Sequence, residues 1–197
     1  MSVSNCGHDE RGQYHGGKAG DQTGTEYYVR AWYNFGQNVV LRPATSAIGK
    51  ELAKIAMDAA NNNNIGYDQY ERITYYNNLK AVGWEPSKIK TKCEADCSAS
   101  TAANVIAVGH RLNIASLKNL APTLYTGNIR NGLVAAGFTA LTASKYLNSD
   151  AYLLPGDIIL REKHHVNINL TTGSKAGSEV YPKEPKKTTS KTSSYTG

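Results

Sequence analysis

The chain has 197 residues, of which 40% are hydrophobic and 19% are charged, and its formal net charge is +6. This composition is typical of one compact soluble domain, and no apolar run approaches the ~20 residues that a membrane-spanning helix needs. Residues 183–197 hold four lysines and one glutamate, so half of the net charge lies in this short segment. The weakly basic remainder has no basic stripe interleaved with stacking aromatic residues, which argues against a nucleic-acid-binding function.

Glycine, tyrosine and polar residues dominate the first 45 residues, and we expect this segment to form an extension packed on the domain. A strand could lie within residues 27–33. A helix is expected next, capped by Thr45 or Ser46, because apolar residues recur at helical spacing at Ile48, Leu52, Ile55 and Ala59. A second helix is expected from about Asp68, with Glu71 three residues on as in a capping box.

Later segments predict two further helices and then strands. One helix begins at Cys97 with small residues in its first turns, and another runs over about 126–136. Short apolar or alternating runs at 157–160 and 165–170 indicate strands. Helices first and antiparallel strands later predict an α+β domain over residues 1–181, and the Lys, Thr, Ser and Pro content of 182–197 predicts a linker or tail.

Three cysteines, Cys6, Cys93 and Cys97, are too few for a disulfide-stapled domain. Cys97 stands out because it begins a predicted helix, where unpaired N–H groups and the helix dipole favour a thiolate. A nucleophilic cysteine also needs a base, and histidine is the natural candidate.

Two adjacent histidines lie at the start of the last predicted strand, and strand alternation distinguishes them. His164 has the parity of the apolar residues Val166 and Ile168, whereas His165 shares a polar face with Asn167. A catalytic imidazole should face a cleft, so we predict His165 as the general base of Cys97.

The ordered set of motifs resembles the NlpC-type papain-like cell-wall hydrolases. It consists of Asp96-Cys97-Ser98, then Pro155-Gly156-Asp157-Ile158-Ile159, then His165-Val166. The segments 16–24 and 66–69 are similar to a subset found in bacteriophage lysins of Gram-positive hosts. The resemblance covers roughly residues 8–170.

The resemblance implies a papain-like fold with an N-terminal helical part and a C-terminal antiparallel sheet. It also implies that Cys97 attacks a stem-peptide amide of peptidoglycan, that His165 carries the proton, and that no cofactor is needed. Tyr67, Asp96 and Ser98 correspond to the family positions that contact the stem peptide. A third polar residue usually orients the imidazole from the strand after the histidine strand. No residue there matches, so Asn167 is the candidate third member and Glu179 a distant alternative.

Several alternatives stay open at this stage. The same residues suit a D-glutamyl endopeptidase, which we favour, or an N-acetylmuramoyl-L-alanine amidase. A zinc site using Cys93, Cys97 and a histidine, or a wall-binding module without catalysis, are rival interpretations. The N-terminus does not resemble a secretory signal, so we expect synthesis in the cytoplasm of a host bacterium and action on the wall after release. A wall-binding domain could follow the tail.

Overall fold

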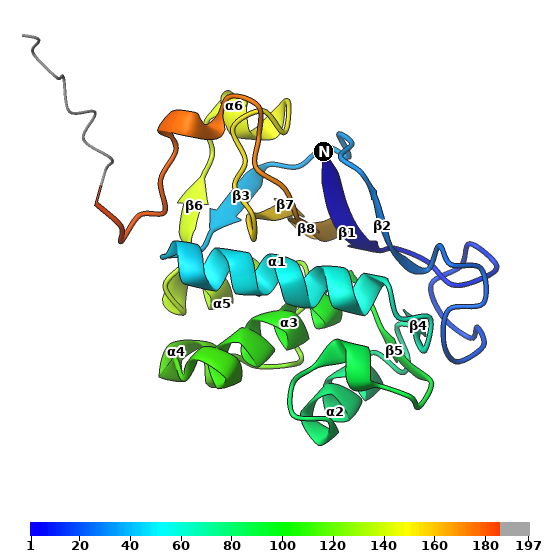
Figure 1. Ribbon diagram of the computed structural model, residues 1–197. Helices are drawn as coiled ribbons and strands as arrows, with labels where there is room; N and C mark the ends of the chain where they lie inside the picture. Colours follow the sequence, from blue (N-terminus) through cyan, green and yellow to red (C-terminus); the bar gives the residue numbers. More distant parts are fainter. Residues whose placement is uncertain (186–197) are drawn as a thin grey trace, which may run out of the picture.

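A computed structural model describes residues 1–185 of the protein (Figure 1). Most of the predicted tail, from residue 186 onward, lies outside the described residues. Within them, a six-stranded antiparallel sheet has the order β2-β1-β8-β7-β3-β6. Its strands are β1 (Ser2–Cys6), β2 (Tyr27–Ala31), β3 (Val39–Arg42), β6 (Thr139–Leu141), β7 (Ile158–Arg161) and β8 (His165–Asn169).

The sheet differs from the expectation of a C-terminal sheet, because three of its strands come from the first 45 residues. The two predicted strands form as β7 and β8 and pair with each other, and β1 and β3 flank this pair on its two sides. All four residues of β3 are buried. A strand buried on both faces has no polar alternation, so periodicity does not reveal it.

Two long helices, α1 (Ser46–Ala60) and α3 (Cys97–Leu112), pack along one face of the sheet (Figure 1). The predicted cap is confirmed, since the Thr45 side chain accepts a hydrogen bond from the Ile48 N–H. The opposite face carries a smaller apolar cluster that includes Val3 and Ile159. The remaining helices are α2 (Thr74–Ala81), η1 (Pro86–Lys88), α4 (Ala115–Lys118), α5 (Ile129–Ala135), α6 (Ser144–Leu147) and η2 (Ala176–Ser178).

The second helix starts later than predicted, at Thr74 rather than near Asp68. The Asp68 carboxylate instead accepts hydrogen bonds from the Gly16 and Tyr70 N–H groups, so it closes a turn and anchors the N-terminal segment. A second, two-stranded sheet pairs β4 (Ile65–Tyr67) with β5 (Cys93–Ala95) in parallel. Because β5 leads directly into α3, this small sheet positions the start of that helix.

The described chain stays attached to the domain beyond residue 181. The Lys183 N–H donates to the Ala44 carbonyl at 2.9 Å, and Glu184 accepts from the Ser46 N–H at 2.6 Å. Glu184 therefore supports the first turn of α1, where a negative charge is favourable. None of the helices in residues 1–185 has the length and apolarity to cross a bilayer.

Candidate active site

Cys97 and His165 line the same cleft, which has a volume of about 830 Å³. Cys97 is the first residue of α3, and His165 is the first residue of β8. The cleft is also lined by aromatic residues, namely Tyr14, Tyr28, Tyr33, Phe35, Tyr67, Tyr70 and Tyr125. The structure thus brings together the two residues that the sequence predicts as nucleophile and base.

The sheet opens beside Cys97. Pairing between β1 and β8 covers Val3 with Asn169 and Ser4 with Ile168, and it stops there. The Val166 N–H, past the end of this pairing, lies against the Cys97 thiol. The Cys97 sulfur, at the start of α3, therefore lies where β1 and β8 separate.

Burial controls the protonation of Cys97. Loss of solvent and then the neighbouring Asp96 carboxylate raise the pKa of the thiol to about 12, although the N–H groups of Val166 and Ser98 and the Arg72 guanidinium oppose this shift. The expectation of a thiolate favoured by the helix start is therefore not met, because desolvation outweighs the helix terminus. The Cys97 side chain is therefore a neutral thiol at physiological pH.

Asn5 of β1 holds the His165 ring. The Nε2 atom of His165 lies 2.8 Å from the Asn5 Oδ1, and the Tyr33 hydroxyl donates to the same oxygen at 2.9 Å. A carbonyl oxygen only accepts, so the ring proton sits on Nε2 and Nδ1 keeps its lone pair. Phe35 packs edge-on against the ring at 5.1 Å between centroids. This arrangement presents Nδ1 as a base.

His165 is neutral at physiological pH. Burial and then the positive charge of Arg30 lower its pKa to about 4. Within residues 1–185 no hydrogen bond joins the imidazole to the Cys97 thiol. Cys97 and His165 thus form a neutral thiol–imidazole pair that lines one cleft.

The candidate third member, Asn167, lies in the middle of β8 and is 2% exposed. Its Oδ1 and Nδ2 atoms have no hydrogen-bond partner in the described structure, and it makes no hydrogen bond to His165. Glu179, the alternative, forms ion pairs with Arg42 and Lys145. Asn5, which does contact the ring, was missed because only the strand order brings β1 beside β8.

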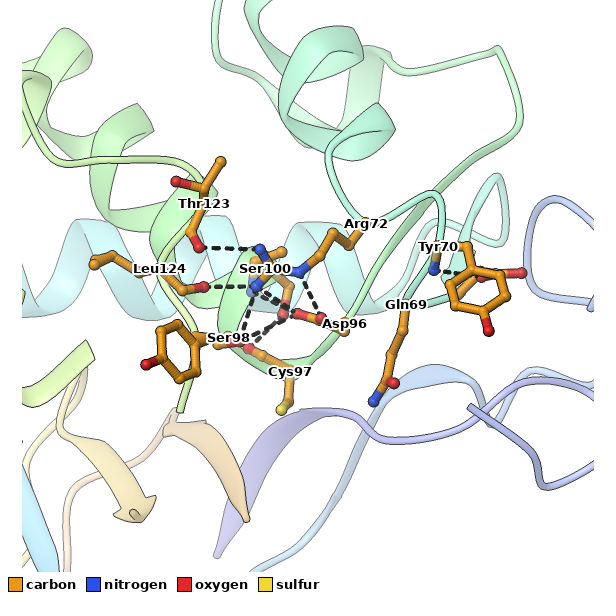
Figure 2. Close-up of polar contacts among 12 residues, drawn as sticks. Gln69, Tyr70, Arg72, Asp96, Cys97, Ser98, Ser100, Thr123 and Leu124 are labelled. Atoms are coloured by element: carbon orange, nitrogen blue, oxygen red, sulfur yellow. Dashed lines mark hydrogen bonds and ion pairs between the residues drawn. The ribbon is translucent and has the colours of Figure 1, made fainter. Parts of the chain in front are cut away.

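Asp96 and Ser98 are engaged with Arg72 (Figure 2). The Asp96 carboxylate caps α3 through the Ala99 N–H at 2.8 Å and binds Arg72 Nε and Nη2 at 2.6 and 3.2 Å. The Ser98 hydroxyl accepts from Arg72 at 3.0 Å and donates to Asp96 at 3.2 Å. Figure 2 shows the Cys97 sulfur pointing away from this cluster.

Arg72 also joins the start of α3 to the loop before α5. Its guanidinium donates to the carbonyls of Thr123 and Leu124 at 3.1 and 2.6 Å, and this loop leads to the cleft residue Tyr125. Arg72 was not predicted from the sequence, because no local motif marks it. Tyr67, predicted to contact substrate, lines the cleft, and its hydroxyl accepts from Gln69 Nε2 at 3.0 Å.

Cys6 and Cys93 are buried, free thiols. Burial raises the pKa of Cys93 to about 12, and the neighbouring Glu94 adds to the shift. Across the part of the chain that the structure describes, no group of three or more His, Cys, Asp or Glu side chains is arranged to hold a metal ion.

Comparison with known proteins gives one family. Residues 3–176 match the family described as an endolysin-like domain. No curated protein and no solved structure matches the chain. Because the family match spans most of the 197 residues, the protein belongs to the endolysin-like domain family.

Proposed function

We propose that this protein is a peptidoglycan hydrolase that cleaves an amide bond of the stem peptide by cysteine nucleophilic catalysis. Membership of the endolysin-like domain family supports the substrate, since endolysins are lytic enzymes that act on the cell wall. One observation carries the mechanism: His165 and Cys97 line the same cleft, and Asn5 holds the neutral imidazole so that Nδ1 is free to accept a proton.

In the first step the Cys97 sulfur attacks the amide carbon while its proton passes to Nδ1 of His165. The tetrahedral intermediate collapses to a thioester, and the imidazolium returns the proton to the leaving amine. Water, deprotonated by the same nitrogen, then hydrolyses the thioester. The Cys97 backbone N–H, at the first position of α3, is a donor for the oxyanion because helix starts leave such groups without an intrahelical partner.

A papain-like fold of the NlpC type is part of this proposal. It is supported by the cysteine at the start of a helix and the histidine at the start of an antiparallel strand. The resemblance expects the orienting residue on the strand after the histidine strand. In this chain β1 is the neighbour of β8 on that side, and Asn5 supplies the oxygen.

We favour a D-glutamyl endopeptidase, made in the cytoplasm and acting on the wall after release. Mass spectrometry of fragments released from purified sacculi tests both the reaction and the bond. The expected products carry a new carboxyl group on D-glutamate and a new amine on the following residue. Release of stem peptides with a free L-alanine amine would identify an amidase instead. New reducing sugar ends would overturn the proposed function.

A further inference from the structure

The cleft carries an excess of positive charge. Among the described residues that line it, four are permanent cations, namely Arg30, Arg72, Arg161 and Lys163, and one is a carboxylate, Asp96. Arg72 and Asp96 neutralise each other through their two-pronged contact. The other three cations form no ion pair with any residue in the described range 1–185.

Arg30 is the most constrained of these three cations. Its side chain is half-buried, and the guanidinium carbon lies 3.7 Å from the centre of the Tyr33 ring. This ring holds the guanidinium plane in place. Within residues 1–185, however, none of the Arg30 guanidinium N–H groups has a hydrogen-bond acceptor. A partly desolvated guanidinium with free donors is suited to a planar, two-oxygen ligand such as a carboxylate.

Its position relates Arg30 directly to the reacting groups. The Tyr33 hydroxyl donates to Asn5, and Asn5 in turn holds His165. Arg30 is also close enough for its charge to contribute to the lowered pKa of His165. A ligand bound by Arg30 would therefore lie on the histidine side of the cleft, beside the scissile bond.

Arg161 extends the same charged region. It pairs with His165 across β7 and β8, so the two side chains emerge on the same face of the sheet. One of its guanidinium nitrogens lies 3.4 Å from the Phe35 carbonyl oxygen. Residues 33–35 thus contact both arginines, Arg30 through the Tyr33 ring and Arg161 through the Phe35 carbonyl.

We propose that Arg30, assisted by Arg161, forms a carboxylate-binding subsite that recognises a free carboxylate of the substrate next to the scissile amide. This inference rests on the proposed function and specifies its substrate. A D-glutamyl residue linked through its side-chain carboxyl keeps its α-carboxylate free, only a few atoms from the bond that is cut. The corresponding D-isoglutamine carries a neutral amide at that position.

Binding of the carboxylate also has a consequence for the base. An anion on Arg30 offsets the charge that disfavours the imidazolium, so the pKa of His165 rises in the complex. The acid limb of kcat, which reports the complex, should therefore lie at higher pH than that of kcat/KM, which reports the free enzyme.

The test compares two soluble stem peptides that differ only in D-glutamate against D-isoglutamine. For the wild type we expect kcat/KM to favour the carboxylate roughly 10- to 100-fold, as for a charge-assisted hydrogen bond. Arg30→Gln should reduce this preference to within about twofold, and Arg161→Gln should reduce it in part. Arg130→Gln, which loses an ion pair to Glu162 outside the cleft, should keep the full preference.

Equal rates on both peptides in the wild type, or equal losses on both in Arg30→Gln, would overturn the subsite while leaving the proposed function intact. Hydrolysis of neither peptide, together with no stem-peptide cleavage in sacculi, would overturn the proposed function itself. Unfolding midpoints of the variants verify that each is folded, and Arg161→Gln supplies a second measurement if Arg30→Gln is not.

Discussion

Replacing Asn5 with alanine removes the oxygen that fixes the His165 ring. The Nε2–H then loses its acceptor at 2.8 Å, and the Tyr33 hydroxyl loses the same acceptor at 2.9 Å. A buried donor left unpaired costs roughly 1–3 kcal/mol. If this cost falls on the oriented base, kcat/KM drops roughly 5- to 150-fold, since 1.36 kcal/mol corresponds to tenfold in rate.

Asn5→Asp gives a second, directional measurement. A carboxylate beside the ring favours the imidazolium, so the pKa of His165 rises above its value of about 4. In the proposed mechanism His165 acts as a base only when neutral, so the acid limb of the kcat/KM profile should move to higher pH. The assay is hydrolysis of a soluble stem peptide followed across the pH range.

Asn167→Ala is the matched control, because Asn167 is a buried asparagine on the adjacent strand with no hydrogen-bond partner in the described structure. We expect a far smaller loss than for Asn5→Ala. A larger loss at Asn167, or equal losses at both positions, would refute the assignment of Asn5 and restore the sequence-based choice.

Arg72→Ala should lower the free energy of unfolding by roughly 2–3 kcal/mol, or the midpoint by roughly 4–12 °C, because Asp96 and two loop carbonyls lose their donor. An unchanged midpoint in thermal unfolding would contradict this. Burial raises the pKa of Glu94 to about 8, so this carboxyl stabilises the fold below pH 4.5 and loses that effect as pH rises through about 8. Glu94→Gln should therefore be more stable than the wild type near pH ~9 but not near pH ~4, and parallel midpoint curves would refute the shift. Glu184→Ala should cost about 1 kcal/mol, because the Ser46 N–H loses its acceptor, whereas Glu184→Gln should cost less. Equal midpoints for wild type and Glu184→Ala would mean that this contact does not stabilise α1.

The elements with one-sided patterns could be predicted from the sequence. α1 has a polar and an apolar face, and the Thr45 cap marks its start. α3 begins where Asp96 caps it, and β8 alternates from His165 onward. In each case the signal lies in neighbouring residues, so it needs no knowledge of the fold.

The strand order of the sheet and the contact that orients His165 depend on residues far apart in the chain, and the spacing of residues in the sequence does not reveal such contacts. β1 joins the sheet between β2 and β8, although almost the whole chain separates β1 from β8. Asn5 therefore meets His165 from 160 positions away. The neutral thiol was also not predicted, because burial of Cys97 follows from how α3 packs against β8 and β1 and not from its place at a helix start.

The rate of stem-peptide release from sacculi by Cys97→Ala, compared with Cys93→Ala, tests the central claim most directly. Both thiols are buried and only three residues lie between them, so the two variants match in chemistry and burial. The thioester mechanism predicts no release above background for Cys97→Ala and near wild-type release for Cys93→Ala, with both variants folded by circular dichroism. Release by folded Cys97→Ala at a rate close to wild type would contradict the assignment of Cys97 as the nucleophile.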